Sequence, residues 1–251
     1  MLSFPAIAER DESFLIQTPW GRAQYTRRVG DLLHPERESP ETLARLRQTV
    51  GEYNFAGQYQ QAPSPLGGGM VKQEWFTCYE AGQVPDSFDQ IIQSWDTANK
   101  ETELSDFSVC LTLGIKGTAI TVLHVLRKRL NYPELKRAVR EQAEVHRATL
   151  VLIEDKASGT QLIQELVHDG CSMVQAVSPA GDKVMRLHAQ TAMIENGCVS
   201  LPKEAPWLAE YVHELTTFPR AKHDDQVDAT SQALAWIQET RRMMTFSCDF
   251  G

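Results

Sequence analysis

Long apolar runs, closely paired cysteines and a secretion signal are all missing from the 251-residue sequence. The longest apolar stretches, such as residues 120–126 and 149–153, are far shorter than the roughly 20 residues that cross a bilayer. The N-terminus lacks a basic flank followed by a long apolar region. The five cysteines are odd in number and widely spaced, which fits neither a disulfide framework nor paired zinc ligands. We therefore expect a soluble, unsecreted protein with no membrane partner, in a reducing cytoplasm.

An excess of positive charge is also missing. The chain has 33 acidic and 25 basic residues and a net charge of −8, which argues against a protein that coats DNA through a diffuse basic field. A local basic rim around an acidic metal site is compatible with this total. Hydrophobic residues make up 42% of the chain, enough for one large or two modest globular domains.

Prolines and a run of three glycines punctuate residues 1–85, and this composition predicts an irregular or helical arm. One clear helix is predicted over residues 40–50, because Ser39 can cap it and Pro40 suits its first position. A second, short helix is expected over residues 53–61.

Residues 86–242 have a regular hydrophobic pattern, and we expect them to form one domain. Strands are predicted over 91–96, 107–115 and 119–127, and their short connections imply an antiparallel meander. Helices between the later strands allow those strands to be parallel. The sequence therefore predicts an α/β domain with a mixed sheet flanked by helices. A helix that Pro133 opens is expected next, carrying Leu135, Ala138, Val139 and Ala143. The later elements are expected at 149–153 (strand), 159–170 (helix), 172–177 (strand), 182–197 (helix), from Pro206 (helix) and at 223–242 (helix), before a tail over 243–251.

Acidic residues lie where the predicted topology would gather them. Asp96 and Glu154 each end a strand, and two parallel neighbours would bring these carboxylates together at the carboxyl edge of the sheet. Asp225 and Asp228 share a face at the start of the last helix, which suits two ligands of a metal pair. Asp224 is better placed to cap that helix. Each acid taken alone is typical of a turn or a helix start. The predicted topology brings all of them to one place, however, and this favours a cation site.

Four motifs resemble, in order and spacing, the C-terminal nuclease domain of the large terminase subunit of tailed bacteriophages and prophages. They are Trp95-Asp96-Thr97-Ala98, the stretch from Leu152 to Gly159, the stretch from Gly181 to Arg186, and the stretch from His223 to Ala229. This resemblance implies a ribonuclease-H-like fold. It also implies that residues 1–85 include the segment joining the family's ATPase to its nuclease.

The resemblance implies catalytic roles for Asp96, Glu154 and Asp225, with Asp228 as a further metal ligand and Asp224 as a competitor of Asp225. Two Mg²⁺ or Mn²⁺ ions are expected, one helping to generate hydroxide and both stabilising an in-line displacement at a DNA phosphate. Oxygen ligands agree with these metals. The candidates for contacting DNA phosphates are Lys183, Arg186, Arg220 and Lys222.

The implied activity is an endonuclease that cuts concatemeric phage DNA at genome packaging in the bacterial cytoplasm. The implied partners are double-stranded DNA, the portal protein and the small terminase subunit. One departure is that the sequence contains neither a Gly-x-x-x-x-Gly-Lys-Ser/Thr motif nor any Gly-Lys dipeptide, so no ATPase site is expected in this chain. The chain is expected to be an excised domain or a prophage product that lacks the ATPase.

The alternative to a nuclease is an inactive prophage remnant that docks on the portal or on neighbouring subunits. The intact set of acids disfavours it. A two-carboxylate glycosidase needs no clustered extra acids, and a Ser hydrolase is disfavoured because no Gly-x-Ser-x-Gly occurs.

Overall fold

The chain divides into two compact units, residues 1–67 and 68–251. The structure, a computed structural model, describes residues 4–9, 11–18, 21–51, 55, 57–61, 69–97, 107–156, 158–179, 181–221 and 223–248. In this part of the chain no helix is long and apolar enough to cross a membrane.

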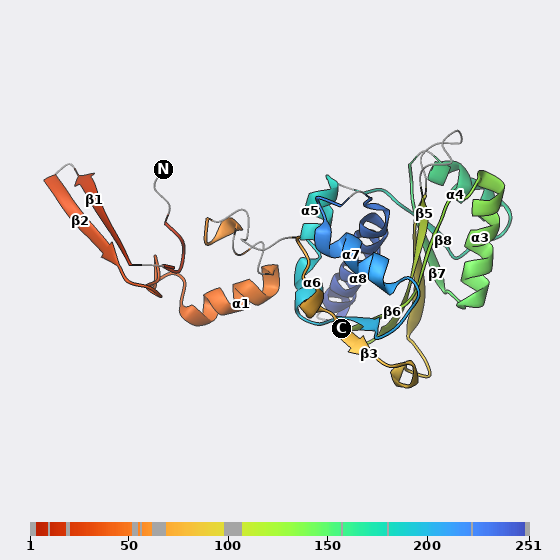
Figure 1. The fold of residues 1–251 in the computed structure, drawn as a ribbon, viewed down its shortest axis with the longest axis horizontal. Helices are drawn as coiled ribbons and strands as arrows, with labels where there is room; N and C mark the ends of the chain where they lie inside the picture. Colours follow the sequence, from red (N-terminus) through yellow and green to blue (C-terminus); the bar gives the residue numbers. More distant parts are fainter. Residues whose placement is uncertain are drawn as a thin grey trace. The chain divides into compact units, whose positions relative to one another are not determined.

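The first unit contains a β-hairpin that the sequence analysis does not predict. Strands β1 (Glu12–Thr18) and β2 (Gly21–Arg27) pair antiparallel (Figure 1). Most of β2 is exposed, so no alternation of apolar and polar residues marks it in the sequence. The expected irregular or helical arm is therefore partly a sheet.

The predicted first helix is present as α1 (Pro40–Val50). The Ser39 hydroxyl accepts a backbone N–H of its first turn at 3.2 Å. The helix ends at Gly51, whose φ of 78° lies in the left-handed region that favours glycine. Leu43 is buried with Phe55, so the helix covers the small core of this unit.

In the described part of the second unit, seven strands form one mixed sheet in the order β3-β9-β6-β5-β4-β7-β8. The three central neighbours β4, β5 and β6 are antiparallel, whereas β7 pairs parallel with both β4 and β8. The predicted mixed sheet is therefore confirmed. The strands are β3 (Thr77–Tyr79), β4 (Gln90–Asp96), β5 (Ser108–Lys116), β6 (Ala119–Lys128), β7 (Leu150–Glu154), β8 (Val174–Val177) and β9 (Val199–Pro202).

The short strands β3 and β9 extend the sheet beyond the prediction. Each pairs parallel with its neighbours, β3 with β9 and β9 with β6. Their three and four residues are too few to show a hydrophobic period in the sequence. Because β3 belongs to the sheet, the boundary expected near residue 85 falls inside the second unit.

Helices cover both faces of this sheet (Figure 1), with α3 and α4 on one face and α5, α6, α7 and α8 on the other. The helix expected over residues 182–197 is interrupted between two short helices, where the Thr191 hydroxyl donates to the carbonyl of His188 at 2.9 Å. The last helix continues past the predicted end at 242. The helices are α3 (Tyr132–Val145), α4 (Ser158–His168), α5 (Lys183–His188), α6 (Thr191–Glu195), α7 (Leu208–Thr217) and α8 (Asp225–Cys248).

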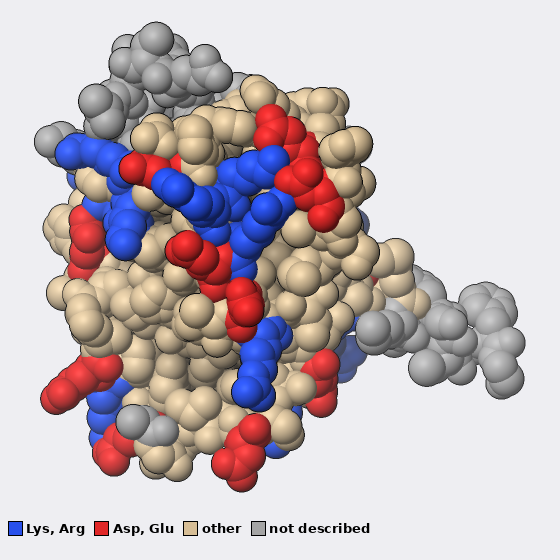
Figure 2. Space-filling model, turned by 90° about the vertical axis from the view of Figure 1, so that its right-hand side faces the viewer, with Lys and Arg blue, Asp and Glu red and all other residues tan. Residues whose placement is uncertain are grey.

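Basic and acidic side chains are interleaved on the face that carries α3 and α4 (Figure 2). Lys136 of α3 lies 2.6 Å from Glu165 and 2.9 Å from Asp169, and Arg140 also pairs with Asp169. These pairs link α3 to α4 and its C-terminal end. They also balance the charge there, so this face presents no uniformly basic field for DNA.

Gly159, in the first turn of α4, allows a close approach between α4 and the end of β7. A Cβ atom at this position would lie 2.0 Å from the carbonyl oxygen of Glu154. We predict that Gly159→Ala destabilises the fold by about 1–3 kcal/mol through this clash, although alanine usually favours a helix. Urea unfolding measures the effect. Gly82→Ala is the matched control, because a Cβ there meets nothing within 4 Å; equal stability of both variants would contradict the predicted clash.

Candidate metal-binding nuclease site

Strand β4 directs Asp96 toward α8. Side chains alternate along a strand, and Trp95 lies in the core shared with α3 and α4. Ser94 points the other way and accepts a hydrogen bond from the Gln232 side chain of α8 at 2.9 Å. Asp96, two residues further on, therefore shares the α8 face of the sheet at the end of the strand.

Strand β7 brings Glu154 to the same edge and the same face. The parallel register pairs Trp95 with Ile153, so Asp96 and Glu154 follow at neighbouring strand ends. Ile153 lies in the α3–α4 core, and Glu154 accordingly faces α8. Its side chain is only 12% exposed and pairs with Lys156 at 2.7 Å. The expected juxtaposition of two strand-end carboxylates is present.

The first turn of α8 adds Asp225 and Asp228 to this edge. The side chain of Asp228 is 5% exposed, whereas Asp225 is less buried, with 23% of its side chain exposed. Burial, followed by the charges of Asp228, Glu154 and Asp225, raises the pKa of Asp96 well above its ordinary value. The four carboxylates are thus close enough to interact. The charge of Asp228 raises the pKa of Asp96 more than the charge of Asp225 does.

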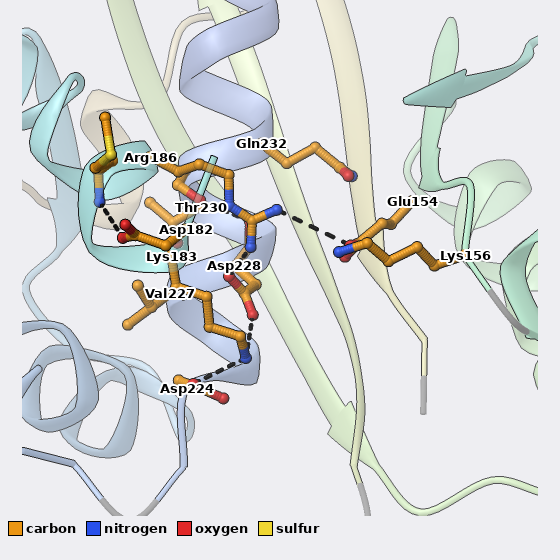
Figure 3. A network of polar contacts seen from close by, with 12 residues as sticks. Glu154, Lys156, Asp182, Lys183, Arg186, Asp224, Val227, Asp228, Thr230 and Gln232 are labelled. Atoms are coloured by element: carbon orange, nitrogen blue, oxygen red, sulfur yellow. Dashed lines mark hydrogen bonds and ion pairs between the residues drawn. The ribbon is translucent and has the colours of Figure 1, made fainter. Parts of the chain in front are cut away.

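Two cations of α5 reach into this group of acids. Lys183 Nζ lies 2.6 Å from Asp228 Oδ2 and 2.8 Å from Asp224 Oδ2. Arg186 Nη2 lies 2.5 Å from Asp228 Oδ1, and the guanidinium points on toward Glu154 (Figure 3). Both residues were expected to contact DNA phosphates, but here they neutralise the acids.

The ion pairs described above for the acids do not involve Arg220, the third DNA-contact candidate among the described residues. Arg220 is exposed in the turn after α7, and Lys222 lies outside the described residues. Their proposed role therefore stays a prediction.

The N-terminus of α8 is capped by a residue that sequence analysis did not single out. The buried carboxylate of Glu214, in α7, accepts the backbone N–H of Gln226 and the side-chain amide of Gln226, both at 2.7 Å. Asp224 was expected to provide this cap, but its carboxylate instead accepts from Lys183. The contact between Glu214 and Gln226 joins different helices, so local sequence gives no signal for it.

Arg127 of β6 is the second residue that sequence analysis missed. Its Nη2 lies 3.8 Å from Asp225 Oδ2 and 4.0 Å from Glu214 Oε2, and its guanidinium stacks on the Phe107 ring with Cζ 3.9 Å from the centroid. Arg127 Nη1 also pairs with Glu210, so one guanidinium serves acids of both α7 and α8. The alternation of side chains along β6 could have indicated that Arg127 faces inward. It could not have indicated which residues pair with Arg127.

The donor set fits a hard divalent cation, because it consists of carboxylate oxygens on three rigid elements. Among the residues that the structure describes, no three His, Cys, Asp or Glu side chains are grouped closely enough to hold a metal ion as they stand. In this arrangement Asp225 lies beside Arg127, and Asp228 is paired with Lys183 and Arg186.

A mixed sheet with three antiparallel strands, two further parallel strands and carboxylates at its carboxyl edge defines a ribonuclease-H-like domain. The model of the family described as "Terminase RNaseH-like domain" matches residues 93–236, more than half of the chain. The protein belongs to this family, and the predicted fold class and family resemblance are confirmed.

Solved structures agree with this fold. A large terminase from a thermophilic bacteriophage has a TM-score of 0.60 and 14% identity, and the match covers 80% of this chain and 53% of that one. The chain thus spans about half the length of that protein. The large terminase nuclease of the thermophilic phage G20c, solved with bound magnesium, has a TM-score of 0.52 and 15% identity over 68% of this chain and 98% of that one. No curated protein matches the sequence.

The raised pKa of Asp96 predicts how the protein's stability depends on pH. Because the folded pKa exceeds that of the unfolded chain, Asp96 lowers stability as the pH rises from the ordinary carboxyl value through the raised one. Without divalent cations, Asp96→Asn should therefore raise the Tm at neutral pH, and this gain should vanish below the ordinary carboxyl pKa. Thermal unfolding against pH measures it. The exposed Asp86→Asn is the control; a lower Tm for Asp96→Asn at neutral pH would refute the prediction.

The capping role of Glu214 predicts a second stability difference. Glu214→Ala leaves two buried donors of Gln226 without their acceptor, so we expect a loss of about 2–4 kcal/mol in urea unfolding. Asp224→Ala, which removes a half-exposed carboxylate from the same helix start, should cost less than about 1 kcal/mol. A larger loss of stability in Asp224→Ala than in Glu214→Ala would indicate that Asp224 caps the helix.

Proposed function

We propose that the protein is a metal-dependent endonuclease that cuts concatemeric DNA during phage genome packaging. The proposal rests on one observation: four acids, Asp96, Glu154, Asp225 and Asp228, lie together at one edge of the sheet. The charges of the other three raise the pKa of Asp96. Membership of the terminase family supports it, as does the likeness to the G20c nuclease solved with bound magnesium.

In this proposal the four carboxylates would hold two Mg²⁺ or Mn²⁺ ions, with Asp96 as one of the ligands. Bound ions of this kind activate water and stabilise the charge that develops on a scissile phosphate. Asp96 and Glu154 are fixed by adjacent strands, and the hydrogen bond between Gln232 and Ser94 fixes α8 against β4. The protein therefore supplies a rigid frame, which orients the reacting groups before the substrate arrives.

The substrate is double-stranded DNA, and its phosphates contact Lys183, Arg186, Arg220 and Lys222. The portal protein and the small terminase subunit are the proposed protein partners, in the cytoplasm of the bacterial host. Residues 1–85 include the proposed link to a motor ATPase. These assignments rest on the family, and for Lys183 and Arg186 also on their position beside the acids.

Plasmid cleavage tests the proposed function. We predict nicking and linearisation with Mn²⁺ or Mg²⁺, none with EDTA, and a loss to background in Asp96→Asn. Asp225→Asn and Asp228→Asn should each reduce cleavage by about a hundredfold or more, because a displaced ligand misplaces the reacting groups.

Asp224→Asn is the matched control on the same helix and should keep most of the activity, since its carboxylate faces Lys183. Wild-type rates in Asp96→Asn, or cleavage that EDTA leaves unchanged, would refute the proposal. A protein that binds portal protein but never cuts DNA would favour the docking module.

A further inference from the structure

The carboxylate of Asp228 has two different cationic partners, one on each oxygen. Oδ2 lies 2.6 Å from Lys183 Nζ, and Oδ1 lies 2.5 Å from Arg186 Nη2. Figure 3 shows both cations reaching Asp228 from α5, with Arg186 between Asp228 and Glu154 and Lys183 between Asp228 and Asp224. An ammonium group at this distance occupies a lone pair of the oxygen and repels a second cation. Lys183 therefore competes with a divalent cation for Asp228 Oδ2.

The two cations differ in how firmly they are held. The Arg186 side chain is 14% exposed and lies between two acids, with Nη1 3.9 Å from Glu154 Oε1. The Lys183 side chain is 46% exposed and reaches Asp228 and Asp224 from the surface. Release of the arginine would leave Glu154 and Asp228 without a shared partner in a buried, poorly screened environment, whereas the pairs of the exposed lysine are screened by water. Lys183 is thus the more easily exchanged partner of Asp228, and Arg186 is the more firmly held one.

Helix α5 does not depend on Lys183. Asp182 caps the helix and accepts the backbone N–H of Met185 at 2.9 Å. Lys183 occupies the first helical position, where a positive charge is unfavourable to the helix dipole. Moving the ammonium group away from the acids therefore leaves the helix intact. The flexible side chain can then place its charge near another anion.

We propose that Lys183 is an exchangeable counterion, which holds Asp228 Oδ2 in the metal-free protein and moves to a DNA phosphate when a divalent cation takes that oxygen. This inference rests on the proposed function, because it assumes that Asp228 is a metal ligand. The exchange couples the binding of metal to the binding of DNA. Metal binding frees the Lys183 ammonium group to contact DNA, and a contact between that group and DNA leaves Asp228 Oδ2 available to the metal. By linkage, each ligand increases the affinity for the other by the same factor.

Calorimetric titration with Mn²⁺ tests the first half of the exchange. In Lys183→Gln no ammonium group competes for Asp228, so Mn²⁺ should bind about tenfold more tightly than to the wild type. Lys183→Met is the second variant, and circular dichroism checks that both fold. Lys203→Gln is the matched control: it removes a half-exposed lysine whose pair, Glu80 at 2.6 Å, lies outside the acid cluster.

Fluorescence anisotropy of a labelled DNA duplex tests the second half. Wild-type protein should bind the duplex several-fold more tightly with Mn²⁺ than without it, and most of this gain should be lost in Lys183→Gln. The anisotropy is read before cleavage, which a denaturing gel of the same samples checks. The same substitution thus strengthens metal binding and weakens the coupling to DNA, a combination that a merely structural lysine would not produce.

The outcomes separate this inference from the proposed function. If Mn²⁺ does not bind, or binds equally to wild type and Asp96→Asn, both are overturned. The exchange alone is overturned if Mn²⁺ binding depends on Asp96 but Lys183→Gln has the same Mn²⁺ affinity as the wild type. The same holds if the gain in Mn²⁺ affinity in Lys183→Gln is no larger than that in Lys203→Gln. An unchanged metal-dependent gain in DNA affinity in Lys183→Gln also overturns the exchange alone.

Discussion

Repulsion between carboxylates at one edge of the sheet is the constraint on which this site depends. Asp96, Glu154, Asp225 and Asp228 come from three elements, and their charges act together on Asp96. Such a group is stable only if cations or protons balance it. Here the raised pKa of Asp96 and the ion pairs of Asp228 provide that balance without a metal.

The parts of the fold that sequence predicted are those with a strong local pattern. Strands β4, β5, β6 and β7 and helix α3 agree with their predicted ranges to within a residue or two, because each combines a hydrophobic period with a turn or cap signal. From this order alone the parallel pairing of β4 and β7 could be expected, and with it the meeting of Asp96 and Glu154. The site was therefore predictable as far as it depends on strand ends.

What the sequence could not predict depends on contacts between distant residues. Strands β3 and β9 are defined by each other and by β6, not by their own few residues. Likewise Glu214 caps a helix to which it does not belong, and Arg127 of β6 pairs with Asp225 of α8. Asp225 and Asp228 share a face at the start of α8, yet these neighbours give each a different environment.

The start of α8 offsets part of the repulsion between the acids at this edge of the sheet. Carboxylates in the first turn of a helix interact favourably with the dipole, so Asp225 and Asp228 offset part of their mutual repulsion there. Glu214 completes the backbone hydrogen bonds that Asp224 would otherwise satisfy, which leaves Asp224 free to share Lys183 with Asp228. Because capping and charge balance are thus assigned to different residues, the cations around Asp228 can change without unravelling the helix that carries it.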